Sequence, residues 1–178
     1  MRFKLLILLL TIISSSEKFF KYDEEDITVI LIMIHTKSLN LLTEQKQFFD
    51  ELDTILDIIN FDKIKSLIIT SNSDEKFFKP DFDISEIKHI TKQQAQELFV
   101  KGNNILKKLE SLPIPVISII DGFSLGLGLE LSLCRDIRIC TEKSTFGLPE
   151  IGFGIIPSFG SIQRLTKIIG VSMAKQMI

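Results

Sequence analysis

Two glutamates, Glu130 and Glu150, stand twenty residues apart in a stretch rich in glycine and proline. Glu130 follows Gly126 and Gly128, and Glu150 follows Pro149. Two carboxylates that converge on one spot can hold a water molecule between them, one taking a proton from it and the other giving a proton back. The spacing alone also fits a simpler interpretation, in which Glu130 helps to cap a helix and Glu150 lies at the surface.

A second motif in the same stretch suggests different chemistry. Residues 122–126, Gly-Phe-Ser-Leu-Gly, spell the G-x-S-x-G of a serine hydrolase. A nucleophilic serine needs a base, most often a histidine, and in α/β-hydrolases that histidine follows the serine. Both histidines, His35 and His89, precede Ser124. A serine–lysine pair stays open, although S-x-x-K is absent at Ser124. We expect Ser124 to be a small residue in a tight turn.

The glycine-rich turn can instead offer backbone N–H groups. Gly126, Leu127 and Gly128 stand where a short helix is expected to begin. The first N–H groups of a helix have no partner within it, and the helix dipole favours negative charge there. A carbonyl oxygen that becomes anionic during a reaction would be stabilised at such a point. Glycines before a helix are also common packing devices, so this signal is weak by itself.

Composition limits the function further. The chain of 178 residues is long enough for one domain with a real core. A net charge of −2 argues against a nucleic-acid partner, because phosphate backbones require a basic surface. Cys134 and Cys140 are too few for a disulfide framework, and we expect both to be buried thiols. The two histidines are far apart in sequence, so we expect no metal site.

Residues 1–16 differ from the rest of the chain. Arg2 and Lys4 precede an apolar run from Leu5 to Ile13, and three serines follow. This order is typical of a secretory signal peptide. It also fits a buried first strand or helix, or a misassigned start codon, and these alternatives stay open. The run is short for a membrane span.

Apolar periodicity and turn residues predict strands that alternate with helices, which indicates an α/β fold with mostly parallel pairing. Thr43 is the expected N-cap of the first helix, and residues 71–83 are expected to form a loop. The strands are predicted at residues 27–34, 66–70, 115–120 and 136–140. The helices are predicted at residues 43–59, 91–110, 129–134 and 162–169, with a further one beginning at Val171.

A family resemblance decides between these interpretations. The stretch IPVISIIDGFSLGLGLELSLCRDIRICTEKSTFGLPEIGFGIIPSFGSIQRLTKIIGVSMA closely resembles the crotonase superfamily of enoyl-CoA hydratases and isomerases. It follows, without gaps, the family's G-G-G-x-E-L-x-x-x-C-D, A-x-F-[GA]-x-P-E and G-x-x-P-x-x-G-x-x-x-[RQ]-L. ITVILIMIHTKSLNLLTEQKQFFDELDTIL and SLIITSNSDEKFFKPDFDISEI are similar to upstream family segments. The resemblance covers residues 17–178 as one domain and leaves residues 1–16 outside, which favours a leader there.

The resemblance implies a fold, a site and a reaction. The fold would be a spiral of β-β-α turns, and two backbone N–H groups would hold the thioester oxygen of an acyl-CoA. Hydratases of the family add water across the 2,3-double bond with two glutamates, which match Glu130 and Glu150. Isomerases of the family rely on the second glutamate. The N–H of Leu127, between Gly126 and Gly128, matches one oxyanion donor. The family has glycine there, so we expect the leucine side chain to crowd the thioester.

The other oxyanion donor departs from the family pattern. Aligned through Phe78 and Asp83, the donor falls on Pro80, and the family glycine after it falls on Asp81. Proline has no N–H, so half of the oxyanion hole would be missing. A shift of one residue would let the N–H of Asp81 or Phe82 take the donor's place.

Two further departures concern the edges of the site. The family's R-P-K-x-x-N is degraded to residues 36–40, where Lys37 and Leu39 are the candidate contacts to CoA. The chain ends at Ile178, where the family continues with helices that cover the acyl pocket and build a trimer. The resemblance therefore implies an incomplete domain that lacks most of the C-terminal helical segment. We expect Met173, Met177 and Ile178 to lack their usual partners.

The sequence therefore predicts an acyl-CoA enzyme, a hydratase of 2-enoyl-CoA in fatty-acid β-oxidation. Two alternatives stay open: an enoyl-CoA isomerase that uses Glu150, and a catalytically weak protein of the same fold that binds acyl-CoA or a protein partner. Coenzyme A would be part of the substrate, and no other cofactor is expected. The resemblance places the chain in mitochondria or the cytoplasm, the apolar N-terminus favours secretion, and a homo-oligomer is possible.

Overall fold

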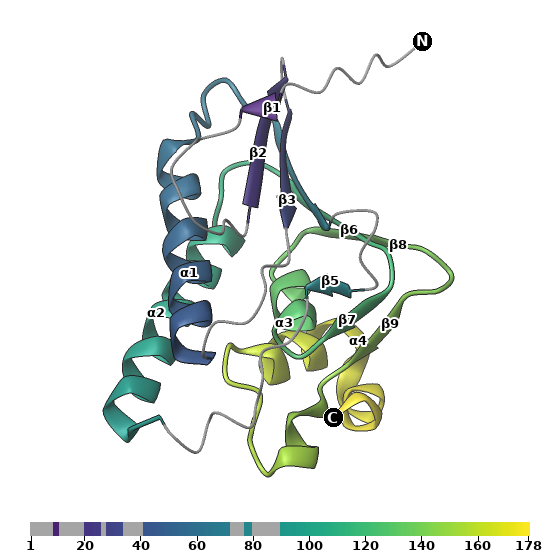
Figure 1. Ribbon diagram of the computed structural model, residues 1–178. Coiled ribbons are helices and arrows are strands. Elements are labelled where there is room, and N and C mark those ends of the chain that lie inside the picture. The colour runs from purple at the N-terminus through teal and green to yellow at the C-terminus, as the bar shows by residue number, and fades with distance from the viewer. Residues whose placement is uncertain (1–8, 11–19, 26–27, 34–40, 72–76, 80–89) are drawn as a thin grey trace.

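The computed structural model describes residues 9–10, 20–25, 28–33, 41–71, 77–79 and 90–178 (Figure 1). From β4 onward the elements repeat one pattern: a strand, a second shorter strand, and a helix. In chain order they are β1 (Leu9–Leu10), β2 (Phe20–Glu25), β3 (Thr28–Met33), α1 (Leu41–Ile58), β4 (Ser66–Ser71), β5 (Phe77–Lys79), α2 (Lys92–Glu110), β6 (Val116–Ile120), β7 (Phe123–Leu125), α3 (Leu127–Leu133), β8 (Ile137–Cys140), β9 (Thr145–Gly147), the 3₁₀ helix η2 (Pro149–Phe153) and α4 (Ser161–Met177).

The two strands of each repeat enter two different sheets. The first strands join a six-stranded sheet in the order β1-β2-β3-β4-β6-β8, parallel from β3 onward. The second strands form a three-stranded parallel sheet in the order β5-β7-β9. The repeats β4-β5-α2, β6-β7-α3 and β8-β9-α4 are successive turns of one spiral. The predicted β-β-α spiral is therefore the observed architecture.

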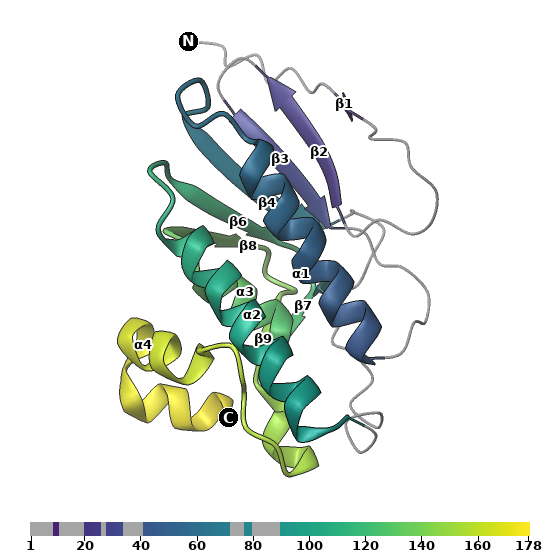
Figure 2. The same ribbon diagram turned by 90° about the vertical axis from the view of Figure 1, so that its left-hand side faces the viewer.

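The helices α1 and α2 lie side by side against one face of the larger sheet (Figure 2). The ion pairs Lys101–Asp50 and Lys108–Asp57 advance together along both helices, so the two helices run in the same direction. Alternation along the strands sends one set of side chains into the core beneath the helices. The core residues of this layer include Phe48, Phe49, Leu52, Leu56, Leu67, Ile69, Leu106, Leu109, Val116 and Ile120.

The structure confirms the main helices and strands of the prediction and corrects their details. The interval 71–83 is not one loop, because Ser71 belongs to β4 and residues 77–79 form β5. Thr43 lies inside α1 and does not cap it. The helix predicted from residue 129 begins at Leu127, so the N–H groups of the glycine turn do start a helix. The two helices predicted on either side of Gly170 are confirmed: within α4 the backbone is non-helical at Gly170, where φ is 77° and ψ is 162°.

One expectation about an individual side chain was wrong. Cys140 is exposed, because it ends the edge strand β8, whereas Cys134 is buried as predicted. Met177 and Ile178 have partners: both pack against a cluster that includes Leu148, and the Met177 carbonyl accepts the Leu148 N–H at 2.8 Å. Met173 is half exposed. Among the described residues, no helix is both long and apolar enough to cross a membrane.

Candidate active site

The N-terminus of α3 is built on an unusual backbone conformation at Gly126. Its φ of 49° and ψ of −123° lie where side chains are strongly disfavoured, so this turn requires glycine. The Gly126 N–H donates to the Gly147 carbonyl at 3.1 Å, and the Gly126 carbonyl accepts from the Glu130 N–H at 2.9 Å. The latter bond closes the first turn of α3. The N–H groups of Leu127 and Gly128 therefore precede the hydrogen-bonded ladder of the helix.

The Leu127 side chain lies in the hydrophobic core and is 2% exposed. It packs in the same cluster as Leu131 and Phe159. We expected this side chain to crowd a thioester. Its place in the core shows that a leucine fits here while its N–H remains at the start of the helix.

Glu130 lies one turn further along α3 and is 2% exposed. Its Oε1 accepts two hydrogen bonds, from the Phe159 N–H at 2.9 Å and from the Ser161 hydroxyl at 2.7 Å. Both donors come from the segment that leads into α4. A buried carboxylate is costly without such donors. Glu130 thus interacts with a distant segment through its side chain and does not act as a simple helix cap.

Glu150 lies in η2, next to Pro149, and is 7% exposed. Its carbonyl accepts the N–H of Ile155 at 3.2 Å, which closes the end of η2. Gly154 ends the element with φ of 72°, in the left-handed region. The simpler interpretation placed a glutamate after proline at the surface. The structure buries this side chain instead.

The hydrogen bond between Gly126 and Gly147 relates the two glutamates in space. Glu130 is one helical turn, about 5.4 Å of rise, beyond Gly126, and Glu150 is three residues beyond Gly147. Glu130 also binds the far end of the segment that Glu150 begins. The turn before Glu130 is therefore bonded to the strand that precedes Glu150, and both carboxylates are buried.

Ser124 is not placed for nucleophilic attack. It lies in the middle of β7, and its side chain is fully buried. Its hydroxyl makes no hydrogen bond among the described residues. The turn that follows β7 serves the helix, and the serine-hydrolase interpretation finds no support in this geometry.

Several predicted site residues lie outside the described residues. They are Lys37, Leu39, Pro80, Asp81, Phe82 and Asp83. The described strand nearest to the loop of the second oxyanion donor is β5. Its last residue, Lys79, pairs with Ser124 of β7, two residues before Gly126, and β5 contacts α3.

Sequence reasoning missed the residues that hold Glu130. The segment 158–164 is fixed to α2 at two points: Asn103 Nδ2 donates to the Ser158 carbonyl at 2.9 Å, and Arg164 forms an ion pair with Glu110 at 3.0 Å. Arg164 also donates to the Phe159 carbonyl at 2.7 Å. The sequence signal for Arg164 was its match to the family's [RQ]-L. No pattern pointed to Ser161.

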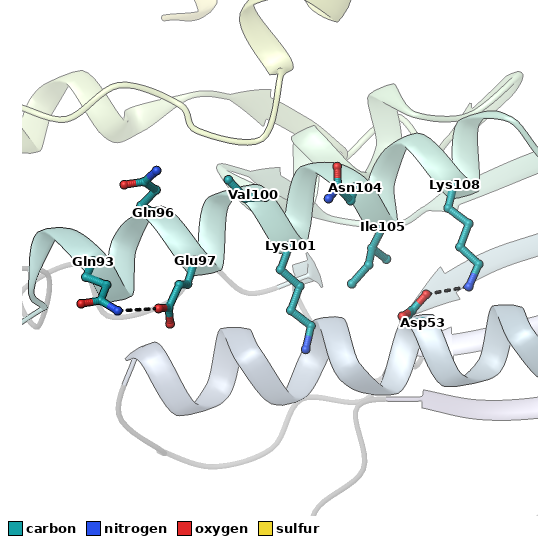
Figure 3. A pocket seen from close by; sticks show the side chains of 9 residues that line it. All are labelled: Asp53, Gln93, Gln96, Glu97, Val100, Lys101, Asn104, Ile105 and Lys108. Carbon is teal, nitrogen blue, oxygen red and sulfur yellow. Dashed lines mark hydrogen bonds and ion pairs between the residues drawn. The ribbon is translucent and has the colours of Figure 1, made fainter.

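A groove of about 750 Å³ lies elsewhere, along α1 and α2 (Figure 3). Apart from Asp53 of α1, its lining comes from α2. Lys108 crosses to Asp53 at 2.6 Å, and Gln93 donates to Glu97 at 3.0 Å. None of the lining residues belongs to the glutamate site. The groove is open, and its exposed ion pairs contribute little to stability.

The family model described as "Enoyl-CoA hydratase/isomerase" matches residues 24–178. The chain belongs to this family. It is 35% identical over 156 residues to a short-chain-enoyl-CoA hydratase of Clostridium acetobutylicum, covering 88% of this chain and 59% of that relative. It is 33% identical over 162 residues to a crotonyl-CoA hydratase of Syntrophomonas wolfei, again covering 88% and 59%.

Solved structures agree with the observed spiral. An enoyl-CoA hydratase structure from Geobacillus kaustophilus superposes with a TM-score of 0.79 at 29% identity, covering 92% of this chain and 61% of that one. One from Bacillus anthracis superposes with a TM-score of 0.77 at 30% identity, covering 90% and 62%. The fold is that of the crotonase superfamily. The chain spans about three fifths of the length of these relatives.

Proposed function

We propose that the protein hydrates 2-enoyl-CoA thioesters to 3-hydroxyacyl-CoA. The observation that carries this proposal is the burial of both glutamates, Glu130 in α3 and Glu150 just beyond the strand whose Gly147 bonds to Gly126. Retention of two carboxylates favours hydration, because an isomerase of this family relies on the second one. The short-chain and crotonyl-CoA hydratases among the relatives support a small 2-enoyl thioester as substrate.

The hydrogen bonds to Glu130 suggest which carboxylate acts as the base and which as the acid. Two donors point at Oε1 of Glu130, an arrangement that suits an ionised carboxylate. Glu130 is therefore assigned as the base that takes a proton from water. The oxygen of that water bonds to C3 of the substrate as the double bond breaks, and Glu150 gives a proton to C2. A proton and a hydroxide are added in total, so no electrons are transferred.

The N–H of Leu127 is assigned to the thioester oxygen, which becomes negative during the addition. The dipole of α3 adds to this stabilisation. The second donor stays a prediction from the sequence: with Pro80 at its position, one N–H would be missing. Coenzyme A enters as part of the substrate.

The test is hydration of crotonyl-CoA by the purified protein, followed as loss of the enoyl-thioester absorbance. We expect Glu130→Gln and Glu150→Gln each to lower kcat by about 10²–10⁴, the usual contribution of a general acid or base. Glu142→Gln is the matched control, because Glu142 lies between them in the chain and is exposed. Unchanged turnover in either site variant would refute the acid/base assignment.

The same variants separate the hydratase from the isomerase. Given a 3-enoyl-CoA, an isomerase would lose activity in Glu150→Gln and keep it in Glu130→Gln. A hydratase needs both glutamates for addition of water to 2-enoyl-CoA. Conversion of 3-enoyl-CoA that is lost in Glu150→Gln and kept in Glu130→Gln, without hydration of 2-enoyl-CoA by the wild type, would therefore favour the isomerase alternative.

A binding protein is the second candidate, and Pro80 at the predicted donor position favours it. Losing one donor of an oxyanion hole typically lowers the rate by about 10²–10³. A folded protein that binds a saturated acyl-CoA in calorimetry and yields no hydration product would establish this alternative. The compartment and oligomeric state stay predictions, which localisation of the tagged full-length protein and its mass in solution would test.

A further inference from the structure

Ser161 contacts Glu130, the proposed base, directly. Its hydroxyl lies 2.7 Å from Oε1 of Glu130, and its side chain is fully buried. It is the first residue of α4, and the N-cap before it, Gly160, makes no side-chain capping bond. The Ser161 hydroxyl is therefore used on a carboxylate of another helix and not on the helix that it begins.

The backbone around Ser161 is fixed independently of its hydroxyl. Gly160 has φ of 85°, and a Cβ there would lie 2.5 Å from Nη1 of Arg164. The Arg164 N–H donates to the Gly160 carbonyl at 3.2 Å, and Asn103 holds the Ser158 carbonyl from α2. The ring of Phe159 packs on the ring of Phe49 at 5.0 Å between centroids. Removal of the hydroxyl alone should therefore leave the segment in place.

We propose that Ser161 is a positioning residue for Glu130, which orients its carboxylate and favours the form that can accept a proton from water. This inference rests on the proposed hydratase function. Of the two donors to Oε1, the Phe159 N–H belongs to the backbone and is insensitive to substitution. The Ser161 hydroxyl belongs to a side chain, so a substitution can remove this donor and leave the Phe159 N–H in place.

Other charged and titratable groups act on Glu130 and stay constant when Ser161 is changed. Arg164 of α4 attracts it across the packed helices, and Glu110 of α2 is paired with Arg164. Cys134 of α3 lies within electrostatic range, and its thiol contacts the Glu130 carbonyl at 3.2 Å. None of these groups bonds to the Ser161 hydroxyl in the described residues, so Ser161→Ala removes one donor and no charge.

The experiment measures the pH profile of crotonyl-CoA hydration in the wild type, Ser161→Ala and Ser161→Thr. We expect Ser161→Ala to lower kcat by about ten- to a hundredfold, the range for a lost hydrogen bond to a charged group. KM should change by less than about twofold, because the Ser161 side chain is fully buried and bonds to Glu130. The acidic limb of the kcat profile should move up by about one pH unit, since an ionised base then loses a donor.

Ser161→Thr keeps a hydroxyl and should keep the position of the acidic limb. Ser132→Ala is the matched control, because Ser132 is equally buried and its hydroxyl, among the described residues, bonds to the Leu129 carbonyl of its own helix at 2.9 Å. It should leave the profile unchanged. An unchanged profile and kcat in Ser161→Ala would overturn the inference while wild-type hydration still supported the proposed function.

A second measurement does not depend on turnover. In the folded wild type with ¹³C-labelled glutamate, NMR follows the titration of the Glu130 carboxyl carbon. Its midpoint should rise by about one pH unit in Ser161→Ala and stay constant in Ser132→Ala. A midpoint that does not move would overturn the inference even in a protein without hydratase activity, and absence of hydration alone would count only against the proposed function.

Discussion

The two ends of α3 treat buried polar groups in opposite ways. At the N-terminal end, Gly126 bonds to β9, and Glu130 receives donors from Phe159 and from Ser161, the first residue of α4. At the C-terminal end, the guanidinium of Arg135 is buried, and all three of its nitrogens lack a hydrogen bond among the described residues. Burial lowers the pKa of Arg135 to about 10. The buried carboxylate of Glu130 therefore has hydrogen-bond donors, whereas the buried guanidinium of Arg135 has no acceptor among the described residues.

This contrast separates activity from stability within one short helix. The polar groups at the N-terminal end are assigned roles in the reaction, so their partners cannot be removed without affecting catalysis. Arg135, at the C-terminal end, lies eight residues beyond Leu127, whose N–H is the proposed oxyanion donor. We expect the buried guanidinium of Arg135 to destabilise the fold, and it has no role in the proposed reaction. Substitutions at the two ends should therefore affect different measurements.

Of the substitutions that compare the two ends of α3, Gly126→Ala is expected to have the largest effect. Gly126→Ala would force a side chain into φ of 49° and ψ of −123°, which should shift the turn and the Leu127 N–H. We expect kcat/KM for crotonyl-CoA to fall by about 10²–10³, as for a lost oxyanion donor. Gly152→Ala is the control, because a Cβ there meets nothing within 4 Å. Equal activity in both variants would show that the turn does not hold the thioester oxygen.

The second effect is a gain in stability at the other end of α3. Arg135→Met should raise the free energy of unfolding by about 1–4 kcal/mol, because an apolar side chain of similar length replaces a buried cation that has no hydrogen-bond partner among the described residues. In a chain of this size that corresponds to about 2–4 °C of Tm per kcal/mol. Crotonyl-CoA hydration should not change. Calorimetry of the two proteins provides the measurement.

Arg138 provides the comparison for Arg135. Its guanidinium does find acceptors, the carbonyls of Arg135 at 2.6 Å and Ser132 at 3.4 Å. Arg138→Met should therefore lower the Tm. If Arg135→Met lowers the Tm as well, the buried guanidinium has a partner that the described residues do not show, and the proposed difference between the two ends of α3 is wrong.

The parts of this fold that the sequence could predict are those with a long local signal. The β-branched run at residues 66–70 and the helix after Thr91, whose capping box with Gln94 is present, both formed as expected. The strands β7 and β9 have three residues each, which is too short for an alternating pattern, and they form only because parallel neighbours supply hydrogen bonds. Such pairing is set by the spiral and not by local preference.

The site was predictable to the extent that it follows a motif. Glu130, Glu150 and the helix start after Gly126 were found through the resemblance, and the structure buries both carboxylates. Ser161 was not found, because its role depends on a contact across 31 residues of sequence. The burial of Arg135 was not predicted for the same reason. It results from tertiary packing, and the local sequence Cys-Arg-Asp does not indicate that the arginine is buried.

The smallest effect concerns Cys134, at the end of α3 next to Arg135. Burial raises the pKa of its thiol from 9.0 to about 11. Between pH 9 and pH 11 the unfolded chain therefore releases this proton more readily than the folded protein. Stability that is fully present below pH 9 should be lost across this interval, by at most about 2.7 kcal/mol. Urea unfolding at pH 8, 9, 10 and 11 would measure the loss.

The Cys134→Ala variant shows how much of the stability lost between pH 9 and pH 11 is due to ionisation of the thiol. The variant should be less stable at pH 8, because it loses the 3.2 Å contact to the Glu130 carbonyl, and its stability should fall less steeply above pH 9. Cys140→Ala is the matched control, since Cys140 is exposed and its removal should leave the slope unchanged. Parallel slopes in the wild type and Cys134→Ala would mean that water reaches this end of α3. Arg135 would then also be hydrated, and the gain expected from Arg135→Met would disappear with it.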